Sequence, residues 1–183
     1  MELKTERLVL RELDIEDLAE VVRLADNLEV SKYLEKVPHP YSKKDGEWFI
    51  GKCNNDAKKD PRENYELAIE CDGKLVGLIG LTDVNEFHGT ATLGYWLGEE
   101  YWRQGIMSEA SREMVRFGFE DLGLRRIDIE ADVENEGSNA LIKKLGAESE
   151  GIRKQYRKSI STGAIADRNI YGLLRNNWEN DKA

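Results

Sequence analysis

The chain has 183 residues, of which 40% are hydrophobic and 34% charged; this composition excludes a disordered chain and suits one domain with a sizeable core. The net charge of −9 argues against a nucleic-acid partner, and it either attracts amines and basic proteins or only keeps the chain in solution. No apolar run reaches the ~20 residues that span a bilayer, and the two cysteines show no metal or disulfide spacing. We therefore expect a cytoplasmic protein without a membrane or metal partner.

The N-terminal part predicts one strand followed by two helices. Hydrophobic residues alternate over 5–13, which indicates a strand, and Asp14 is expected to cap a helix that ends near Ala25. Ser42 and Asp45 have the spacing of a capping box and begin a second helix, which is expected to end near residue 59. Three side chains fit the buried face of that helix: Trp48, Phe49 and Cys53.

Strand patterns dominate from Tyr65 onward. Asp72 and Gly73 are expected to join strands over 66–71 and 74–81 as a hairpin, and a third strand is expected over 90–97. The glycines inside the second of these strands suggest close packing or a bulge. A strand over 126–133 should have one core face and one acidic face.

The C-terminal part predicts one more helix and two strands. Ser138 is expected to cap a short helix that Gly146 ends. Strands over 150–159 and 168–174 should surround a turn, and a polar tail is expected from about Asn176. The order of elements indicates a mixed α/β domain.

The stretch 93–110 organises the chain. It begins as a strand, passes through a polar turn to Gly105, and continues as an amphipathic helix that is expected to end near Leu122. Free N–H groups at such a turn and the positive end of the helix dipole can bind phosphate, and a glycine lets a ligand approach the backbone. An ordinary strand-to-helix connection has the same pattern, so this stretch alone leaves both interpretations open.

A set of short motifs follows the chain in a characteristic order and spacing: Thr5–Arg11, Leu93–Leu97, Tyr101, Trp102, Gly105–Ala110, Val133, Asn135, Ser138, Lys144–Gly146, Glu150, Gly151, Asp167 and Tyr171. Together they resemble the GNAT superfamily of acetyl-coenzyme-A-dependent N-acetyltransferases. The closer resemblance is to the Rim-type branch, whose members acetylate ribosomal-protein N-termini. It implies the fold class α/β (α+β), a single GNAT-type domain over 1–183 with a mixed sheet of about seven strands and about four flanking helices.

The chain departs from the family pattern at four positions. Trp102 and Met107 replace a polar and a small residue of the phosphate-loop motif, although backbone N–H groups there can still bind. Thr92 stands where a glutamate often precedes Leu-Gly-Tyr, and Arg157 stands where some ribosomal-protein enzymes carry an acid. These last two departures leave the general base open.

The resemblance implies acetyl transfer from acetyl-CoA to a primary amine by direct attack in a ternary complex, without a metal. Ser138 is implied as the proton donor to the thiolate, besides its capping role. Glu130 is a candidate general base, with Asp132 and Glu150 as further candidates. A solvated or salt-bridged strand face is the alternative for these acids. The implied cofactor-binding residues are Tyr95, Trp96, Leu97, Arg103, Gln104, Gly105, Ile106, Met107, Ser108, Asn135 and Ser138.

The resemblance favours a protein N-terminal α-amine as the acceptor. Two alternatives stay open: a small amine such as a polyamine or an aminoglycoside-like compound, and a non-catalytic module that only binds acyl-CoA. The loops around 35–42 and 85–90 would decide between acceptors, and their sequences do not. A homodimer is also possible for this fold.

Overall fold

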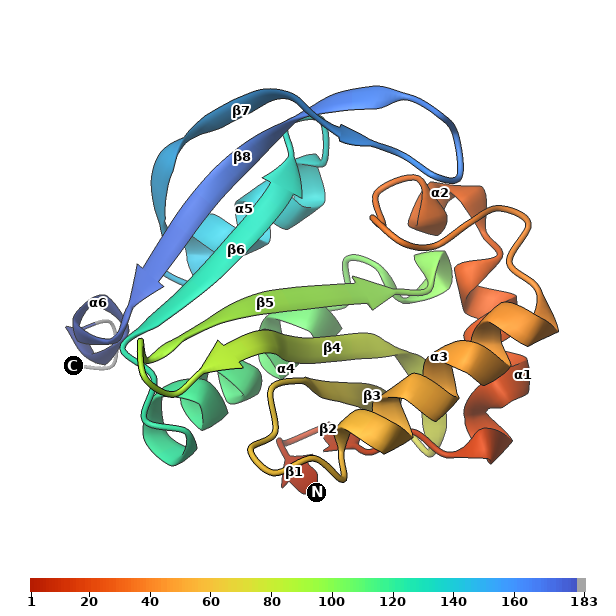
Figure 1. Cartoon of the computed structure of the whole chain (residues 1–183), viewed down its shortest axis with the longest axis horizontal. Coiled ribbons are helices and arrows are strands. Elements are labelled where there is room, and N and C mark those ends of the chain that lie inside the picture. The colour runs from red at the N-terminus through yellow and green to blue at the C-terminus, as the bar shows by residue number, and fades with distance from the viewer. Residues whose placement is uncertain (181–183) are drawn as a thin grey trace.

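The computed structural model of the chain describes residues 1–180 and contains one mixed sheet (Figure 1). Its strand order is β1-β2-β3-β4-β5-β6-β8-β7, and neighbours are antiparallel except β5 and β6, which are parallel. The strands are β1 (Glu2–Lys4), β2 (Leu8–Arg11), β3 (Tyr65–Cys71), β4 (Lys74–Asn85), β5 (Thr90–Leu97), β6 (Arg126–Asp132), β7 (Glu148–Lys158) and β8 (Ile165–Leu174).

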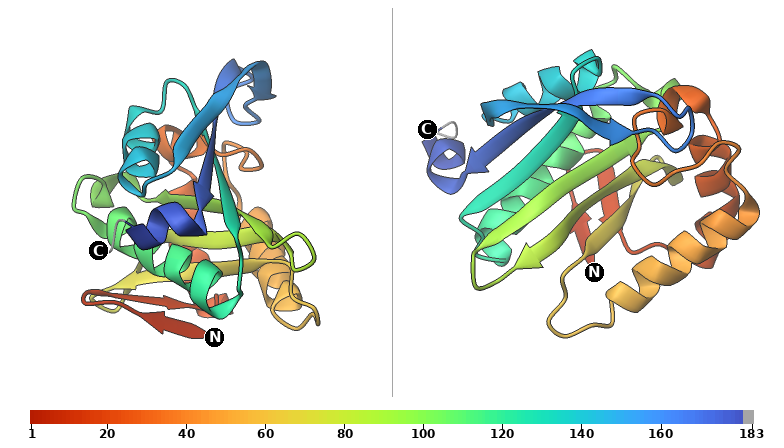
Figure 2. Two further views of the ribbon diagram at one scale, coloured as in Figure 1. Left: turned by 90° about the vertical axis from the view of Figure 1, so that its left-hand side faces the viewer. Right: turned by 45° about the horizontal axis from the view of Figure 1, so that its top comes forward.

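Helices cover both faces of the sheet, as Figure 2 shows from two further sides. Apolar residues of α4 and α5 pack on one face in the larger core cluster, and those of α1 and α3 pack on the other face in a second cluster. The helices are α1 (Leu18–Ala25), α2 (Leu28–Ser31), α3 (Lys43–Asp56), α4 (Ile106–Arg116), α5 (Glu136–Lys144) and α6 (Arg175–Asn180).

The predicted fold class is confirmed, with eight strands in the sheet of the described residues instead of about seven. The hairpin at Asp72 and Gly73 and the strand over 90–97 form as predicted. Asp14 and Ser42 both make capping boxes, so side-chain oxygens satisfy the free N–H groups at these two helix starts. The sequence analysis missed β1 and α2, which are only three and four residues long.

The prediction that Trp48 is buried is wrong, because its side chain is 67% exposed. The buried stripe of α3 contains Gly46, Ile50 and Cys53, and Trp48 lies off this stripe. Gly46 sits so close to α1 that an added Cβ would lie 2.7 Å from a methyl carbon of Leu18. The two helices therefore approach each other along this stripe.

The predicted cap of α5 is also wrong. Asn135 is the N-cap, and its side chain accepts a hydrogen bond from the backbone N–H of Ser138 at 3.1 Å. The helix therefore begins at Glu136, and the Ser138 hydroxyl is free for another partner. The alternation of β6 also fails at its end, where Asp132 is buried and Val133 is 41% exposed.

The expected polar tail begins as α6, and Trp178 of this helix is buried against Phe119 with ring centroids 5.4 Å apart. The helix that was expected to continue to Leu122 ends as α4 at Arg116 and is followed by a π-helical turn, Phe117–Asp121. Among the described residues, we find no helix long and apolar enough to traverse a bilayer.

Candidate functional site

The parallel strands β5 and β6 separate partway along their length. They pair from Thr90 with Arg126 to Leu93 with Ile129, and no pairing follows, whereas β5 remains paired to β4 as far as Leu97. Figure 1 shows the two strands diverging beyond this point. Backbone groups on the β6 side of Gly94–Leu97 are therefore available to a ligand.

A cleft of about 610 Å³ lies where the strands separate. It runs from the first turns of α4 and α5, on one face of the sheet, to α2 on the other, so it connects the two faces. Most of the predicted cofactor-binding residues line it: Tyr95, Trp96, Leu97, Arg103, Gly105, Ile106, Met107, Ser108, Asn135 and Ser138. Val30 and Tyr33 of the α2 region also line the cleft, and the sequence analysis missed them.

The backbone at Gly105 turns directly into α4. Gly105 is the N-cap with a left-handed φ of 78°, and no side chain caps this helix. The N–H groups of the first turn are therefore without a capping acceptor and lie beside the cleft, which is the arrangement that holds phosphate groups. This geometry fits the diphosphate of coenzyme A.

The N-terminal segment braces this turn. Glu109, in the first turn of α4, accepts hydrogen bonds from the Thr5 hydroxyl at 2.5 Å and from Arg7 Nε at 2.6 Å. Arg7 also donates to the backbone oxygen of Gln104 at 3.2 Å, so Gln104 supports the loop and does not line the cleft. The Thr5–Arg7 segment of the N-terminal motif thus holds the loop that faces the ligand.

Trp102 explains one departure from the family motif. Its indole N–H donates to the backbone oxygen of Leu97 at 2.9 Å, which fixes the loop to the end of β5. The indole replaces the polar residue of the motif as a structural hydrogen-bond donor. Its ring also lines the cleft.

Two hydroxyl groups meet inside the cleft. Tyr95 Oη and Ser138 Oγ share a hydrogen bond of 2.8 Å, which is possible because Asn135, and not Ser138, caps α5. Burial raises the pKa of Tyr95 to about 12, so its hydroxyl stays protonated near neutral pH. The pair can therefore donate a proton to a group in the cleft.

The predicted acids of β6 and β7 do not line this cleft. Glu130 accepts from Arg153 at 2.9 Å and lies 3.5 Å from Arg168. Hydrogen bonds and the charge of Arg126 lower the pKa of Glu150, which pairs with it at 2.6 Å. Guanidinium groups hold both carboxylates and neither carboxylate lines the cleft, so the geometry does not support either as the general base.

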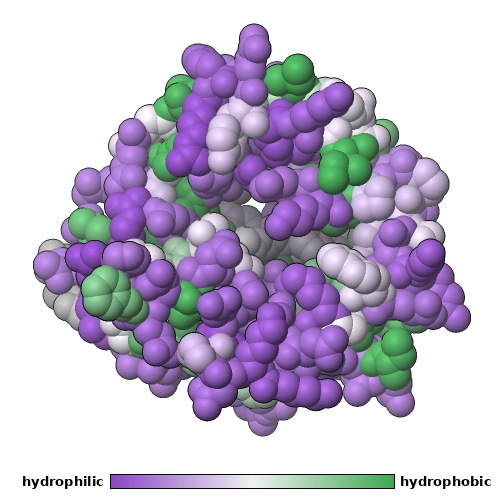
Figure 3. All heavy atoms as spheres, in the orientation of Figure 1, coloured by the Kyte–Doolittle hydropathy of each residue, from purple (hydrophilic) through white to green (hydrophobic). Residues whose placement is uncertain are grey.

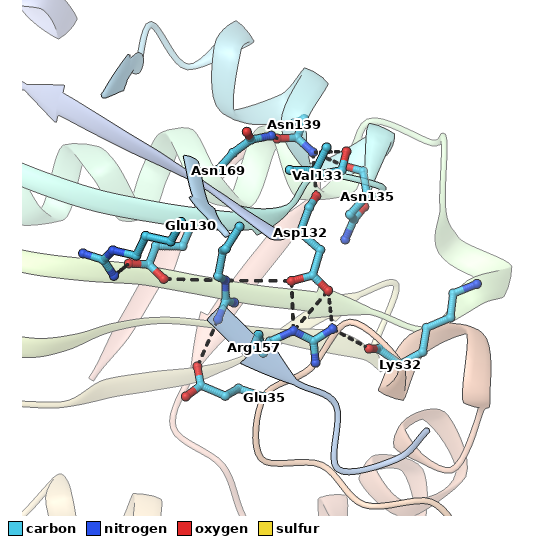
Figure 4. A network of polar contacts seen from close by, with 11 residues as sticks. Lys32, Glu35, Glu130, Asp132, Val133, Asn135, Asn139, Arg157 and Asn169 are labelled. Carbon is cyan, nitrogen blue, oxygen red and sulfur yellow. Dashed lines mark hydrogen bonds and ion pairs between the residues drawn. The ribbon is translucent and has the colours of Figure 1, made fainter. Parts of the chain in front are cut away.

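Asp132 is held in a buried network (Figure 4). Arg157 Nε donates to both oxygens of Asp132 at 2.9 and 3.0 Å, and its Nη2 donates to the backbone oxygen of Lys32 at 2.9 Å. The position that in some related enzymes carries an acid is thus used to join β7, β6 and the end of α2. Asn139 completes the network by donating to the backbone oxygen of Asp132 at 2.9 Å.

Comparisons with known proteins agree with this geometry. The model of the acetyltransferase (GNAT) domain matches residues 7–148. Spermidine N(1)-acetyltransferase of Escherichia coli (strain K12) is 30% identical over 159 residues, which cover 82% of each chain. Ribosomal-protein-serine acetyltransferase of the same strain is 32% identical over 101 residues, 55% of each chain. The crystal structure of a GNAT-family acetyltransferase from Bacillus anthracis has a TM-score of 0.80 and 25% identity, and the match covers 96% of this chain and 99% of that one.

Proposed function

This chain belongs to the GNAT family and is an acetyl-CoA-dependent N-acetyltransferase, and we propose that its acceptor is the α-amine of a protein N-terminus. The observation that carries the proposal is the cleft between β5 and β6, which connects the turn before α4 to the opposite face of the sheet. Figure 3 shows that this opposite face is hollowed at its centre, over β5. An open hollow admits the end of a protein chain.

In this proposal, the backbone N–H groups from Gly105 to Ser108 bind the diphosphate of acetyl-CoA, and the free edge of β5 aligns its pantetheine arm. Acetyl-CoA supplies the thioester that the amine attacks. The Ser138 hydroxyl donates the proton that the departing sulfur needs, and Tyr95 holds that hydroxyl in place. Direct attack needs no covalent nucleophile, in keeping with the burial of Cys53.

A polyamine is the second candidate acceptor. The spermidine acetyltransferase relative aligns over 82% of this chain, a longer match than the ribosomal-protein relative gives. The acidic net charge of −9 would attract polycations as well as basic proteins.

The cytoplasmic location and the homodimer remain predictions, and sedimentation equilibrium would test the dimer.

The test is steady-state CoA release with acetyl-CoA and a panel of N-terminal peptides, spermidine, spermine and an aminoglycoside. We expect the highest kcat/KM for a peptide whose only free amine is its α-amine, and no turnover of the same peptide with a blocked terminus. A higher kcat/KM for the polyamines would overturn the proposed acceptor. Acetyl-CoA binding by calorimetry without any turnover would instead support a non-catalytic module.

A further inference from the structure

One carboxylate on the acceptor face has no role in the site described so far. Glu66 of β3 pairs in register with Gly80 of β4, which pairs with Gly94 of β5. Two glycines therefore separate Glu66 from the strand edge at which the cleft opens. A Cβ added to Gly80 would lie 2.8 Å from Oε2 of Glu66, so the carboxylate extends over Gly80 toward β5.

Gly94 is the exposed member of this row of three residues. It is exposed although its strand is an interior strand of the sheet, and a Cβ added there would meet no atom within 4 Å. It is also the first residue of β5 beyond the last pair with β6. Strands lie about 5 Å apart, so the carboxylate above Gly80 is about one strand spacing from this open position.

Glu66 is half-buried and lacks a direct partner. Among the described residues, no group hydrogen-bonds to it or forms an ion pair with it. The charged and titratable groups that face it are Lys52, Cys53 and Asp56 of α3 and Lys36 of the segment after α2. Lys52 is hydrogen-bonded to Asp56 at 2.8 Å, so its charge is already compensated.

We propose that Glu66 is a catalytic residue that binds the acceptor ammonium over Gly94 and accepts its proton. This proposal rests on the proposed N-acetyltransferase function and deepens it. Glu130 of β6 is already paired, because Arg153 and Arg168 contact its carboxylate. Burial raises the pKa of Glu66 above its usual value, and the positive charges of Lys52 and Lys36 offset only part of this rise. The raised pKa favours proton uptake by the carboxylate.

In the proposed step, Glu66 takes a proton from the amine and Ser138 supplies one to the sulfur. The ammonium gives one proton to the Glu66 carboxylate, and the freed lone pair forms the C–N bond to the thioester carbon while the C–S bond breaks. The nitrogen loses a second proton to water as the amide forms, and the sulfur takes one from the Ser138 hydroxyl, which water then reprotonates. Glu66 returns its proton to water, so one net proton leaves for each amide formed.

The first test is Glu66→Gln, which keeps the shape and removes the charge. We expect kcat/KM for the best amine of the panel to fall by about 100-fold or more, because a general base contributes 10²–10⁴ in rate. The dissociation constant of acetyl-CoA should stay within about twofold, since Glu66 lies on the other face from the α4 turn. The acid limb of the kcat/KM profile should move to the pKa of the free amine, because only the neutral amine can then attack.

Glu63→Gln is the matched control, because Glu63 is exposed just before the same strand. A loss for Glu66→Gln no greater than that of Glu63→Gln would overturn the proposal, as would a larger loss for Glu130→Gln. If Glu66→Gln does not fold, Gly94→Val tests whether the ammonium binds over Gly94. The valine side chain would enter open space, because a Cβ added at this position meets no atom within 4 Å. We expect its amine KM to rise about tenfold with acetyl-CoA affinity unchanged, and an unchanged KM would overturn the proposal.

If the wild type turns over no amine of the panel, the proposed acceptor fails independently of Glu66. Carbon-detected NMR of the Glu66 carboxyl group then decides, with n-butylammonium as the probe in the presence of CoA. We expect a saturable shift of this signal in the wild type. The absence of a shift would overturn the role of Glu66.

Discussion

The hydroxyl pair of Tyr95 and Ser138 lies in the cleft where the thioester sulfur of acetyl-CoA would depart. We expect Ser138→Ala to lower kcat by about 100-fold, because the leaving thiolate loses its proton donor. Tyr95→Phe keeps the ring and removes only the second hydroxyl, so it should lower kcat by a smaller factor than Ser138→Ala does. Stopped-flow measurement of CoA release with saturating substrates checks both, and a larger loss for Tyr95→Phe would assign the acid to tyrosine.

Asn135 and Ser138 have different structural roles, and stability measurements can test that of Asn135. Asn135→Ala removes the N-cap of α5 and should lower the free energy of unfolding by about 1 kcal/mol. Glu134→Gln is the control, and its cost should stay within about 0.5 kcal/mol, because Glu134 is exposed and does not cap the helix, whereas Ser138→Ala would also lose the hydrogen bond to Tyr95. Urea unfolding checks both values, and equal losses would contradict the Asn135 cap.

At the scale of single residues, the sequence predicts the residue types but not their partners. Asn and Ser are nearly equal as N-caps, so propensity cannot decide where α5 begins. Only the hydrogen bond between Tyr95 and Ser138, residues far apart in the chain, shows that the serine hydroxyl faces the cleft.

Glu109 links α4 to the segment before β2, and it should control the affinity for acetyl-CoA. Glu109→Gln weakens the hydrogen bonds from Thr5 and Arg7 that brace the loop before α4. We expect the dissociation constant of acetyl-CoA to rise about tenfold by calorimetry, a loss of ~1.4 kcal/mol. Glu113→Gln is the control on the same helix, where Glu113 pairs only locally with Arg116. Equal effects of the two variants would contradict the bracing role.

The same carboxylate predicts a pH dependence of stability. Burial of Glu109 raises its pKa, but hydrogen bonds from Thr5 and Arg7 outweigh this and lower it below the usual value. A lowered pKa means that the stabilisation is present above the unfolded pKa of ~4.3 and is lost as pH falls through the folded pKa. The difference in unfolding free energy between wild type and Glu109→Gln should therefore shrink below about pH 4.3 in urea titrations.

The buried pair of Arg157 and Asp132 joins β7 to β6 and to the end of α2 (Figure 4). Arg157→Met leaves the buried Asp132 with only Arg168, at 3.9 Å, as a cationic neighbour, and should destabilise the fold by about 3 kcal/mol. Arg153→Met is the control, because the exposed pair of Arg153 with Glu130 should contribute less than about 1 kcal/mol. Urea unfolding compares them, and similar costs would contradict a supporting role of the buried pair.

At the scale of elements, patterns and caps predict most strands and helices, because these depend on neighbouring residues. The sequence misses β1 and α2, which are too short to show a period. It also places Asp132 on an acidic strand face without predicting its burial, because only the packing of β7 and α2 around Arg157 buries this carboxylate.

For the molecule as a whole, the net charge of −9 predicts how substrates approach. Long-range attraction of a cationic acceptor is screened over about 8 Å at physiological salt. We expect kcat/KM for a lysine-rich N-terminal peptide to fall as salt rises from 20 to 300 mM, while that for an acidic peptide of equal length falls less or rises. An equal response of both peptides would show that the charge does not steer the acceptor.

The fold could be predicted from sequence, and the donor side of the proposed site rests on motifs that are contiguous over 93–110 and 133–146. The acceptor side could not be predicted in this way. Glu66, Gly80 and Gly94 come from three strands, and only their register puts them in one row. Glu66 by itself is an ordinary polar residue of an alternating strand.

The cleft between β5 and β6 reaches both faces of the sheet. In the proposed reaction the donor enters from one face and the acceptor from the other, and this arrangement has a kinetic consequence. Donor and acceptor have separate entrances, so neither has to leave for the other to exchange. CoA should then compete with acetyl-CoA but not with the amine. The N-terminus of a protein in a large assembly could stay bound in the hollow while CoA is exchanged for acetyl-CoA from the opposite face of the sheet.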